Sequence, residues 1–234
     1  AAFIIEEGCE IALLRHIVQS MDAEARAAGV RIVTGDTKVV ERGSADQVFI
    51  TTSGVGVIPP GRDLRAASIQ PGDVAIVNGV LGDHGATILA ARGDMALSTD
   101  LISDCNSLNG LMETVIAAAP GLRAARDATR GGVASCLNEM AEAAGVGIEI
   151  DETALPLRAE VKGMCEVLGM DPLYLANEGT LVLFVPQEQA DQTLAAMRKH
   201  PMGKHAVLIG KVLEGPAGRV TMRPLFGGTR LVDM

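Results

Sequence analysis

The stretch Thr34-Gly35-Asp36-Thr37-Lys38-Val39-Val40-Glu41-Arg42-Gly43 places a carboxylate, a hydroxyl and an ammonium on consecutive residues, directly after the mainly apolar run 30–33. A strand that ends in Gly-Asp-Thr-Lys offers a Mg²⁺ ligand, exposed backbone N–H groups beside a small residue, and a cation. These are the groups that a nucleoside triphosphate needs. The alternative is a polar hairpin turn with a solvated lysine, so the stretch by itself leaves both interpretations open.

The composition describes a folded protein whose core contains few aromatic side chains. The 234 residues are 48% hydrophobic but only 2% aromatic, so we expect a core of Ala, Val, Ile, Leu and the 10 methionines. Few aromatic rings leave little for the stacking of nucleic-acid bases. The net charge of −9 comes without a block of Lys or Arg, and we therefore expect neither a nucleic-acid partner nor a membrane-binding surface.

The cysteines and the hydropathy pattern predict a cytoplasmic protein. No C-x-x-C pair joins the four widely spaced cysteines, which are Cys9, Cys105, Cys136 and Cys165. This spacing is typical of reduced thiols rather than of a disulfide framework or a zinc site. No apolar run reaches the roughly 20 residues that span a bilayer, and no leader-like segment opens the sequence. We predict a soluble, non-exported protein.

The first part of the chain predicts one helix and several strands. A helix is expected over residues 9–28, ending at Gly29, because apolar residues recur at three- and four-residue spacing, namely Leu14, Ile17, Val18, Met21, Ala25 and Ala28. Strand-like sequence opens the chain at Phe3-Ile4-Ile5, and further strands are expected at 31–33, 47–52 and 54–58. We expect two of them to pair through the turn at 43–46.

The second part alternates helices and strands. Helices are expected after Gly85, at 109–118, 131–144 and 158–168, and from Pro186 onward, with strands at 74–77, 146–150, 180–185, 205–213 and 219–222. Because the order is not a strict βαβ repeat, we predict a mixed sheet with helices on one face. Proline and glycine punctuate the chain at 59–61 and 70–72, and we place the domain boundary between these segments.

A second polar motif, Arg126-Asp127-Ala128-Thr129-Arg130-Gly131-Gly132, leads directly into the predicted helix 131–144. Paired glycines at a helix start allow close backbone approach, free N–H groups attract anions, and Asp127 can hold a metal ion against a phosphate. In the alternative, Thr129 or Asp127 only caps the helix. The chain has no G-x-x-x-x-G-K-S/T loop and no G-x-G-x-x-G after a strand, so any nucleotide site has another design.

Two further motifs carry a titratable side chain next to glycine. Leu81-Gly82-Asp83-His84-Gly85 opens a helix, where His84 is either a proton carrier or ligand, or part of a helix-start turn capped by Asp83. Ala176-Asn177-Glu178-Gly179 precedes a predicted strand. Glu178 at a strand entrance can act as a base, although an Asn-Glu-Gly turn is also common without any function.

Together, the segments 33–40, 81–89, 126–133 and 176–179 closely resemble those of the HypE family of hydrogenase-maturation factors. These carbamoyl dehydratases belong to the PurM-like, AIR synthase-related superfamily of ATP-using enzymes, and the resemblance covers essentially the whole chain. It implies an α+β fold of two PurM-like domains. Residues 1–65 would be the remaining part of the ATP-binding, dimerising N-terminal domain, and residues 66–234 the C-terminal mixed-sheet α/β domain.

The resemblance also implies a reaction and its participants. ATP phosphorylates the thiocarboxamide oxygen of a carbamoylated C-terminal cysteine, and elimination leaves a thiocyanate. The cyanide then passes to the iron of a nickel–iron hydrogenase. The implied partners are a second copy of the chain in a homodimer, the carbamoyltransferase HypF and the cyanide-accepting HypC/HypD complex.

We assign site residues on the same resemblance. The carboxylates expected to bind Mg²⁺ are Asp36 and Asp127. Those expected to bind the phosphates of ATP are Gly35, Thr37 and Lys38. Proton removal and charge stabilisation during dehydration are assigned to Glu178 together with Lys38.

Two departures from the family pattern and two alternative functions accompany this interpretation. Family members end in a Pro-Arg-Ile-Cys-type tail and begin with a Gly-rich segment, and this sequence contains neither. We therefore expect a chain cut at both ends that folds in large part but is catalytically incomplete. The alternatives are another PurM-like kinase or synthetase, and a non-catalytic module that docks maturation partners.

Overall fold

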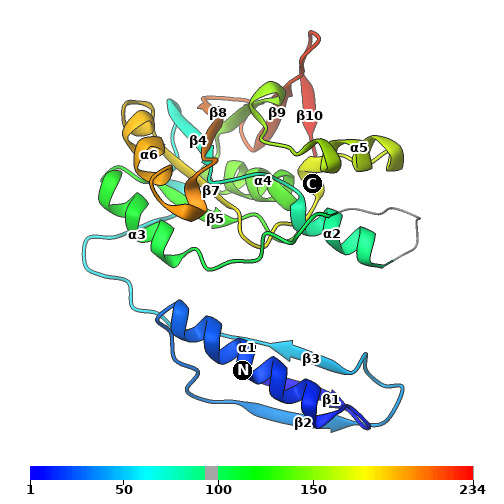
Figure 1. Ribbon diagram of the computed structural model, residues 1–234. Coiled ribbons are helices and arrows are strands. Elements are labelled where there is room, and N and C mark those ends of the chain that lie inside the picture. The colour runs from blue at the N-terminus through cyan, green and yellow to red at the C-terminus, as the bar shows by residue number, and fades with distance from the viewer. Residues whose placement is uncertain (93–99, 234) are drawn as a thin grey trace. The chain divides into compact units, whose positions relative to one another are not determined.

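The computed structural model describes residues 1–92 and 100–233, and the chain divides into two compact units, Ala1–Arg62 and Asp63–Met234 (Figure 1). The domain boundary placed at about residue 65 stays a prediction. Among the described residues, no helix combines the length and the apolar composition needed to cross a membrane.

The first unit is a three-stranded sheet with one helix, α1, alongside it (Figure 1). Strand β1 (Ala2–Glu6) lies in the middle, parallel to β2 (Asp36–Val40) and antiparallel to β3 (Val48–Thr51). The predicted helix is confirmed as α1 (Ile11–Ala27). Most residues of the predicted apolar stripe are half-buried, namely Leu14, Ile17, Met21, Ala25 and, just after the helix, Ala28. Val18 is the exception and is exposed.

Three sequence-based expectations for this unit are wrong. Residues 31–33 and 54–58 are irregular, and no hairpin closes through 43–46, because β1 lies between β2 and β3. A strand forms only where a neighbouring backbone satisfies its N–H and C=O groups. Here β1 pairs with the polar segment from Asp36 onward, whereas Val33 is 81% exposed. Apolar character alone therefore located the strand a few residues too early.

The second unit is built on a seven-stranded sheet in the order β10-β9-β6-β8-β4-β7-β5. Its strands are β4 (Asp73–Val77), β5 (Ala124–Asp127), β6 (Gly147–Asp151), β7 (Leu181–Pro186), β8 (Val207–Leu213), β9 (Arg219–Arg223) and β10 (Arg230–Val232). Only the β6–β9 pair is parallel among the described strands of this sheet. The predicted mixed sheet is confirmed, while β5 and β10 were missed.

Helices cover both faces of this sheet, so the expectation of helices on one face is wrong. The helices of the unit are α2 (Asp83–Ala91), α3 (Asn109–Ala118), α4 (Gly132–Ala144), α5 (Ala159–Leu168) and α6 (Ala190–Met197). Short 3-10 turns lie at Ala66–Ser68, Glu152–Ala154, Pro172–Tyr174, Gln187–Gln189 and Pro201–Gly203. Along β4, Ala75 and Val77 pack in the cluster under α4, whereas Val74 and Ile76 pack with α3 and α6.

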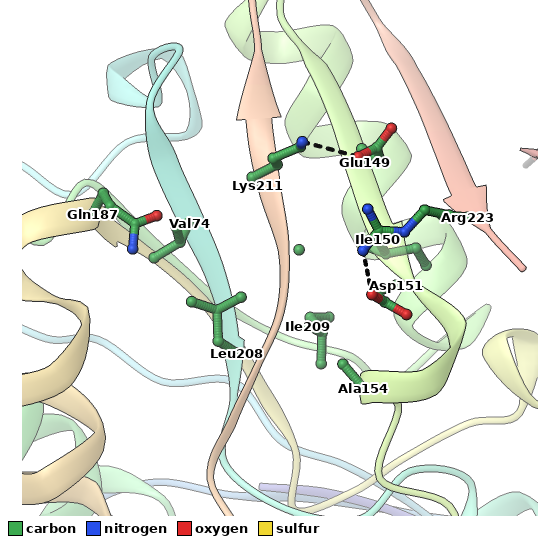
Figure 2. Close-up of a pocket in the computed structure, with 11 residues that line it drawn as sticks. Val74, Glu149, Ile150, Asp151, Ala154, Gln187, Leu208, Ile209, Lys211 and Arg223 are labelled. Atoms are coloured by element: carbon green, nitrogen blue, oxygen red, sulfur yellow. Dashed lines mark hydrogen bonds and ion pairs between the residues drawn. The ribbon is translucent and has the colours of Figure 1, made fainter. Parts of the chain in front are cut away.

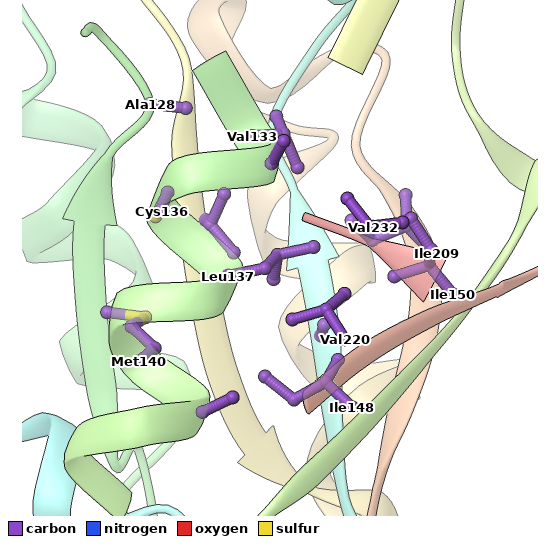
Figure 3. Packing of buried hydrophobic residues seen from close by; sticks show 14 of the residues in the cluster. Ala128, Val133, Cys136, Leu137, Met140, Ile148, Ile150, Ile209, Val220 and Val232 are labelled. Atoms are coloured by element: carbon purple, nitrogen blue, oxygen red, sulfur yellow. The ribbon is translucent and has the colours of Figure 1, made fainter. Parts of the chain in front are cut away.

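The larger core cluster lies between α4 and the sheet (Figure 3). Residues on one side of α4 recur at three- and four-residue spacing, as a helix that packs on a sheet requires; they are Val133, Cys136, Leu137 and Met140. Opposite them lie Ile148, Ile150, Ile209, Val220 and Val232. A separate small cluster joins α2 to α5 through Ala86, Val161, Met164, Cys165 and Leu175. These contacts fix the positions at which the loops leave the sheet.

Candidate functional site

Three of the polar motifs leave the sheet of the second unit at one end. Strands β4 and β5 both run antiparallel to β7. The C-terminal ends of β4 and β5 therefore lie beside the N-terminal end of β7, with Asp127 opposite Leu181 and Val77 opposite Val182. We call this the motif end of the sheet, because the segments that carry His84, Asp127 and Glu178 all lie there.

Asn177 ties these loops together at the motif end. Its side chain is buried, with 1% exposed. The Oδ1 atom accepts a hydrogen bond from Gly82 N at 2.8 Å, and Nδ2 donates to Ala128 O at 2.9 Å and to Leu175 O at 3.1 Å. A buried amide with these partners joins the loop after β4 to the loop after β5, and Glu178 is the next residue along the chain.

The turn that carries Glu178 is held by a carboxylate from a distant part of the chain. Asp104 accepts hydrogen bonds from the backbone N–H of Glu178 at 3.0 Å and of Gly179 at 2.9 Å, and from the Thr180 hydroxyl at 3.2 Å. A Cβ atom at Gly179 would lie 2.0 Å from the Asp104 carbonyl oxygen, so only glycine fits there. Glu178 itself is exposed, which leaves a solvent-accessible carboxylate on a fixed backbone.

His84 lies next to this carboxylate. Its Nε2 atom is 3.8 Å from Glu178 Oε1, and its Nδ1 atom is 2.9 Å from Ser103 Oγ. The side chains of His84 and Glu178 are 23% and 37% exposed. The structure thus brings together two motifs whose relation the sequence did not reveal.

Asp83, expected as a possible helix cap, has a different role. Helix α2 begins after Gly82, which lies in the left-handed region at φ 82° and provides no side-chain cap. Asp83 is the first helical residue and is 3% exposed. Its Oδ2 accepts a hydrogen bond from Arg158 Nε at 2.7 Å, and this bond raises the pKa of the Arg158 guanidinium. The pair joins α2 to the residue that precedes α5.

Asp127 is the last residue of β5 and is exposed. Its Oδ2 accepts a hydrogen bond from the Thr129 hydroxyl at 2.6 Å. Neither residue caps α4, which starts after Gly131 without a side-chain cap. Gly132 has φ +63°, and a Cβ there would lie 2.3 Å from Leu173 O. Gly132 is thus required by close packing against the backbone near Leu173, the approach of an anion to this helix start stays a prediction, and the capping by Thr129 or Asp127 is wrong.

In the first unit, the expected phosphate-binding residues Thr37 and Lys38 lie within β2, and Gly35 directly precedes this strand. Asp36 and Lys38 point to one face of the sheet and Thr37 to the other, because side chains alternate along a strand. Lys38 lies opposite Ile4 on β1, and Ile4 lies opposite Phe49 on β3. All of these residues are exposed within the unit. Asp36 Oδ1 also accepts from the Thr37 N–H at 2.8 Å.

The predicted site residues therefore fall into two sets, each described in its own unit. Gly35, Asp36, Thr37 and Lys38 belong to Ala1–Arg62, whereas the other two, Asp127 and Glu178, lie at the motif end of the sheet in Asp63–Met234. Sequence reasoning missed Ser103, Asp104 and Arg158. They belong to no local motif, and Asp104 lies 74 residues from Glu178 along the chain, so their roles depend on tertiary contacts.

The described residues suit a metal ion that is shared with phosphate oxygens. Among them, no group of three or more His, Cys, Asp or Glu side chains could hold a metal ion alone. Mg²⁺ binds proteins through one or two carboxylates together with water and substrate phosphates rather than through a closed protein cage. Exposed carboxylates such as Asp36 and Asp127 fit the first arrangement and not the second.

Two pockets of the second unit bear on the location of the site. One, of about 310 Å³, lies on β4, β6 and β8 (Figure 2). Its charged side chains form two ion pairs, Glu149–Lys211 and Asp151–Arg223, and within each pair the two charges offset each other. Hydrogen bonds from Thr153, followed by Arg223, lower the pKa of Asp151 to about 2. The other, of about 280 Å³, is lined by Ser103, Asp104 and Thr180. Only the second adjoins the motif end.

Comparisons with known proteins match a separate family model to each of the two units. The model of the AIR synthase related protein, N-terminal domain, matches residues 1–58, and that of the C-terminal domain matches residues 70–223. The chain thus has the two domains of the AIR synthase related class.

Particular relatives narrow the class. The carbamoyl dehydratase HypE of Rhodobacter capsulatus is 68% identical over 234 residues, which are 100% of this chain and 69% of that protein. A crystal structure of the hydrogenase maturation protein HypE in complex with ATP has a TM-score of 0.94 and 43% identity, covering 100% of this chain and 71% of that one. The crystal structure of a HypE–HypF complex has a TM-score of 0.94 and 44% identity, and the match covers 99% of this chain and 75% of that one. The chain belongs to the HypE family of carbamoyl dehydratases.

Proposed function

We propose that this protein catalyses the ATP-dependent dehydration of a carbamoylated C-terminal cysteine to a thiocyanate, which supplies cyanide for the iron of a nickel–iron hydrogenase. The observation that carries the proposal is the 68% identity, over the whole chain, to a carbamoyl dehydratase. The motif end adds chemical support, because it presents the exposed carboxylate of Glu178 on a turn that Asp104 holds in place.

The reaction balances with ATP as the only co-substrate. The thiocarboxamide S–C(=O)–NH₂ attacks the γ-phosphorus through its oxygen, ADP leaves, and one N–H proton is removed to give an S–C(–O-phosphate)=NH species. Loss of the second N–H proton then expels inorganic phosphate and forms the C≡N bond. The carbamoyl oxygen therefore ends in phosphate. Phosphorylation is required because an amide oxygen is otherwise a poor leaving group, and both proton transfers need a base.

We assign the base role to Glu178 and the stabilisation of negative charge to Lys38. The Glu178 carboxylate is exposed and can accept an N–H proton. Lys38 is exposed on β2, and an ammonium stabilises charge that develops on transferred phosphoryl oxygens. Gly35 and Thr37 complete the proposed phosphate contacts.

ATP and Mg²⁺ are the proposed ligands of the enzyme. A related HypE has been crystallised in complex with ATP, and we extend that ligand to this chain. Asp36 and Asp127 are the proposed Mg²⁺ ligands, and the bound ion would neutralise phosphate charge. The exposed carboxylates of both residues suit an ion that phosphates also coordinate.

The proposed partners follow from relatives and from the first unit. A relative forms a HypE–HypF complex, and we propose the same carbamoyltransferase as donor here, with a HypC/HypD complex as cyanide acceptor. We also propose a homodimer through the first unit, whose sheet exposes Ile4 at 41% and Phe49 at 51%. None of the four cysteines forms a disulfide, which supports the proposed cytoplasmic location.

The test uses the protein with its natural termini, carbamoylated by its transferase. Addition of ATP and Mg²⁺ should remove the mass of one water from the C-terminal peptide. Glu178→Gln should retain that mass while binding ATP as the wild type does, with a rate lower by about 100-fold or more. Glu166→Gln, at an exposed position on α5, is the matched control and should behave as the wild type. Normal thiocyanate formation in Glu178→Gln would show that Glu178 is not the base.

A further inference from the structure

We propose that His84, oriented by Ser103, is a positioning residue that directs the Glu178 carboxylate toward its substrate. The inference rests on the proposed function, because it assigns a role relative to the proposed base. It draws on two contacts at the motif end: His84 Nδ1 to Ser103 Oγ at 2.9 Å, and His84 Nε2 to Glu178 Oε1 at 3.8 Å.

The two ring nitrogens of His84 have different neighbours, with Ser103 Oγ beside Nδ1 and Glu178 Oε1 beside Nε2. Ser103 Oγ already accepts a hydrogen bond from the backbone N–H of Cys105 at 3.2 Å. A hydroxyl has one hydrogen to donate, and Ser103 can donate it to His84 Nδ1. When Ser103 donates to Nδ1, a ring with a single proton carries it on Nε2. The N–H that results faces the Glu178 carboxylate.

The backbone around Glu178 is fixed, so the freedom that remains is in its side chain. Asp104 accepts hydrogen bonds from the N–H groups of Glu178 and Gly179, and the preceding residue, Asn177, is buried and bonded to Gly82. The carboxylate can still rotate about its side-chain bonds at 37% exposure. At 3.8 Å, the Nε2–H group attracts the carboxylate and reaches hydrogen-bond distance after a small rotation or through one water. One orientation is thereby favoured over the others.

Ser103 and Asp104 are consecutive, and their side chains act on the two parts of the proposed base. Asp104 fixes the backbone of the Glu178 turn, and Ser103 fixes the ring that faces its carboxylate. The competing explanation is that His84 is a half-buried surface residue satisfied by Ser103 alone. That explanation predicts no functional coupling between His84 and Glu178.

A double-mutant cycle separates the two explanations in the protein with its natural termini. His84→Ala should slow thiocyanate formation by about 10- to 100-fold, as expected when a catalytic group is misplaced by about 1 Å, while the Kd for ATP stays within about twofold. His84→Gln, which keeps an N–H donor, should recover part of the loss. In the Glu178→Gln background, His84→Ala should add no further loss, because the group it positions is gone.

Each outcome bears on one hypothesis. Unchanged rates in His84→Ala, or losses that multiply fully in the double variant, would overturn the positioning role while leaving the base role intact. Full activity in Glu178→Gln would instead overturn the proposed base. Ser103→Ala serves as a second route if His84→Ala unfolds, and it should give a smaller loss of the same kind; an unchanged rate in it would contradict the proposal. His16→Ala, at an exposed position on α1, is the control.

Discussion

Asp104 and Asn177 show how single buried or half-buried side chains assemble a site from separate loops. Asp104 binds two successive backbone N–H groups of the Glu178 turn, and Asn177 bridges the loops after β4 and β5. Removing one partner of a buried hydrogen bond typically costs about 1–3 kcal/mol. Both residues therefore contribute to stability and fix the backbone position of Glu178. The Glu178 side chain itself is exposed and accessible to a substrate.

At the residue scale, we predict that Asp36→Asn reduces Mg²⁺-dependent ATP hydrolysis by about tenfold or more, because loss of the carboxylate charge weakens metal binding while shape is kept. Asp127→Asn should behave likewise. Steady-state rates over a Mg²⁺ titration provide the measurement. Asp46→Asn, at another exposed aspartate of the first unit, should leave the titration unchanged. An unaltered Mg²⁺ dependence in Asp36→Asn would show that this carboxylate is not a ligand.

At the element scale, the sequence predicted the helices and the buried strands well. Residues 109–118 form α3 with the expected bounds, and the apolar strands β4, β6, β7 and β8 were found because continuous or alternating apolar runs mark buried strands. The failures share one physical cause. β2, with the sequence Asp-Thr-Lys-Val-Val, and the edge strand β5 are polar or exposed, and their strand character comes from a neighbour distant in sequence.

The same reasoning separates the site residues that the sequence could identify from those that it could not. Glu178 and His84 lie in glycine-bounded motifs, so their local sequence singled them out. Their proximity depends on β4 and β7 being neighbours in the sheet. Ser103 and Asp104 lie in a segment without regular structure, and their roles became visible only when tertiary contacts were known.

Gly132 at the start of α4 provides an element-scale prediction. Gly132→Ala should destabilise the protein by more than about 1 kcal/mol, because φ is +63° and the new Cβ would lie 2.3 Å from Leu173 O. Gly163→Ala is the matched control inside α5, where nothing lies within 4 Å of the new Cβ. It should stabilise the protein by about 0.5–1 kcal/mol. Urea unfolding of both variants measures the difference, and the reverse order would contradict the geometry of this helix start.

At the scale of the whole molecule, the second unit has a large core built on both faces of one sheet. The reactivity of its buried cysteine thiols depends on how tightly that core is packed. Burial raises the pKa of the Cys136 thiol to about 12 from 9.0. Because the folded-state pKa is the higher one, this contribution to stability is complete below pH 9 and is lost as the pH rises toward 12.

We therefore predict that the free energy of unfolding declines between pH 9 and 12, and that Cys136→Ala, although less stable near neutral pH, shows a shallower decline. Denaturant unfolding at a series of pH values measures this. Alkylation at pH 8 gives a parallel test, in which exposed Cys105 reacts quickly and buried Cys136 reacts only after unfolding. Equal reaction rates in the folded protein would contradict the burial of Cys136.

In the proposed reaction, ATP activates the thiocarboxamide oxygen for its removal. The most direct measurement follows that oxygen. The protein with its natural termini is carbamoylated with a heavy oxygen isotope in the carbamoyl group, ATP and Mg²⁺ are added, and the inorganic phosphate is analysed by mass spectrometry. We expect one labelled oxygen in the phosphate for each thiocyanate formed. Unlabelled phosphate, with the isotope released into water, would contradict it.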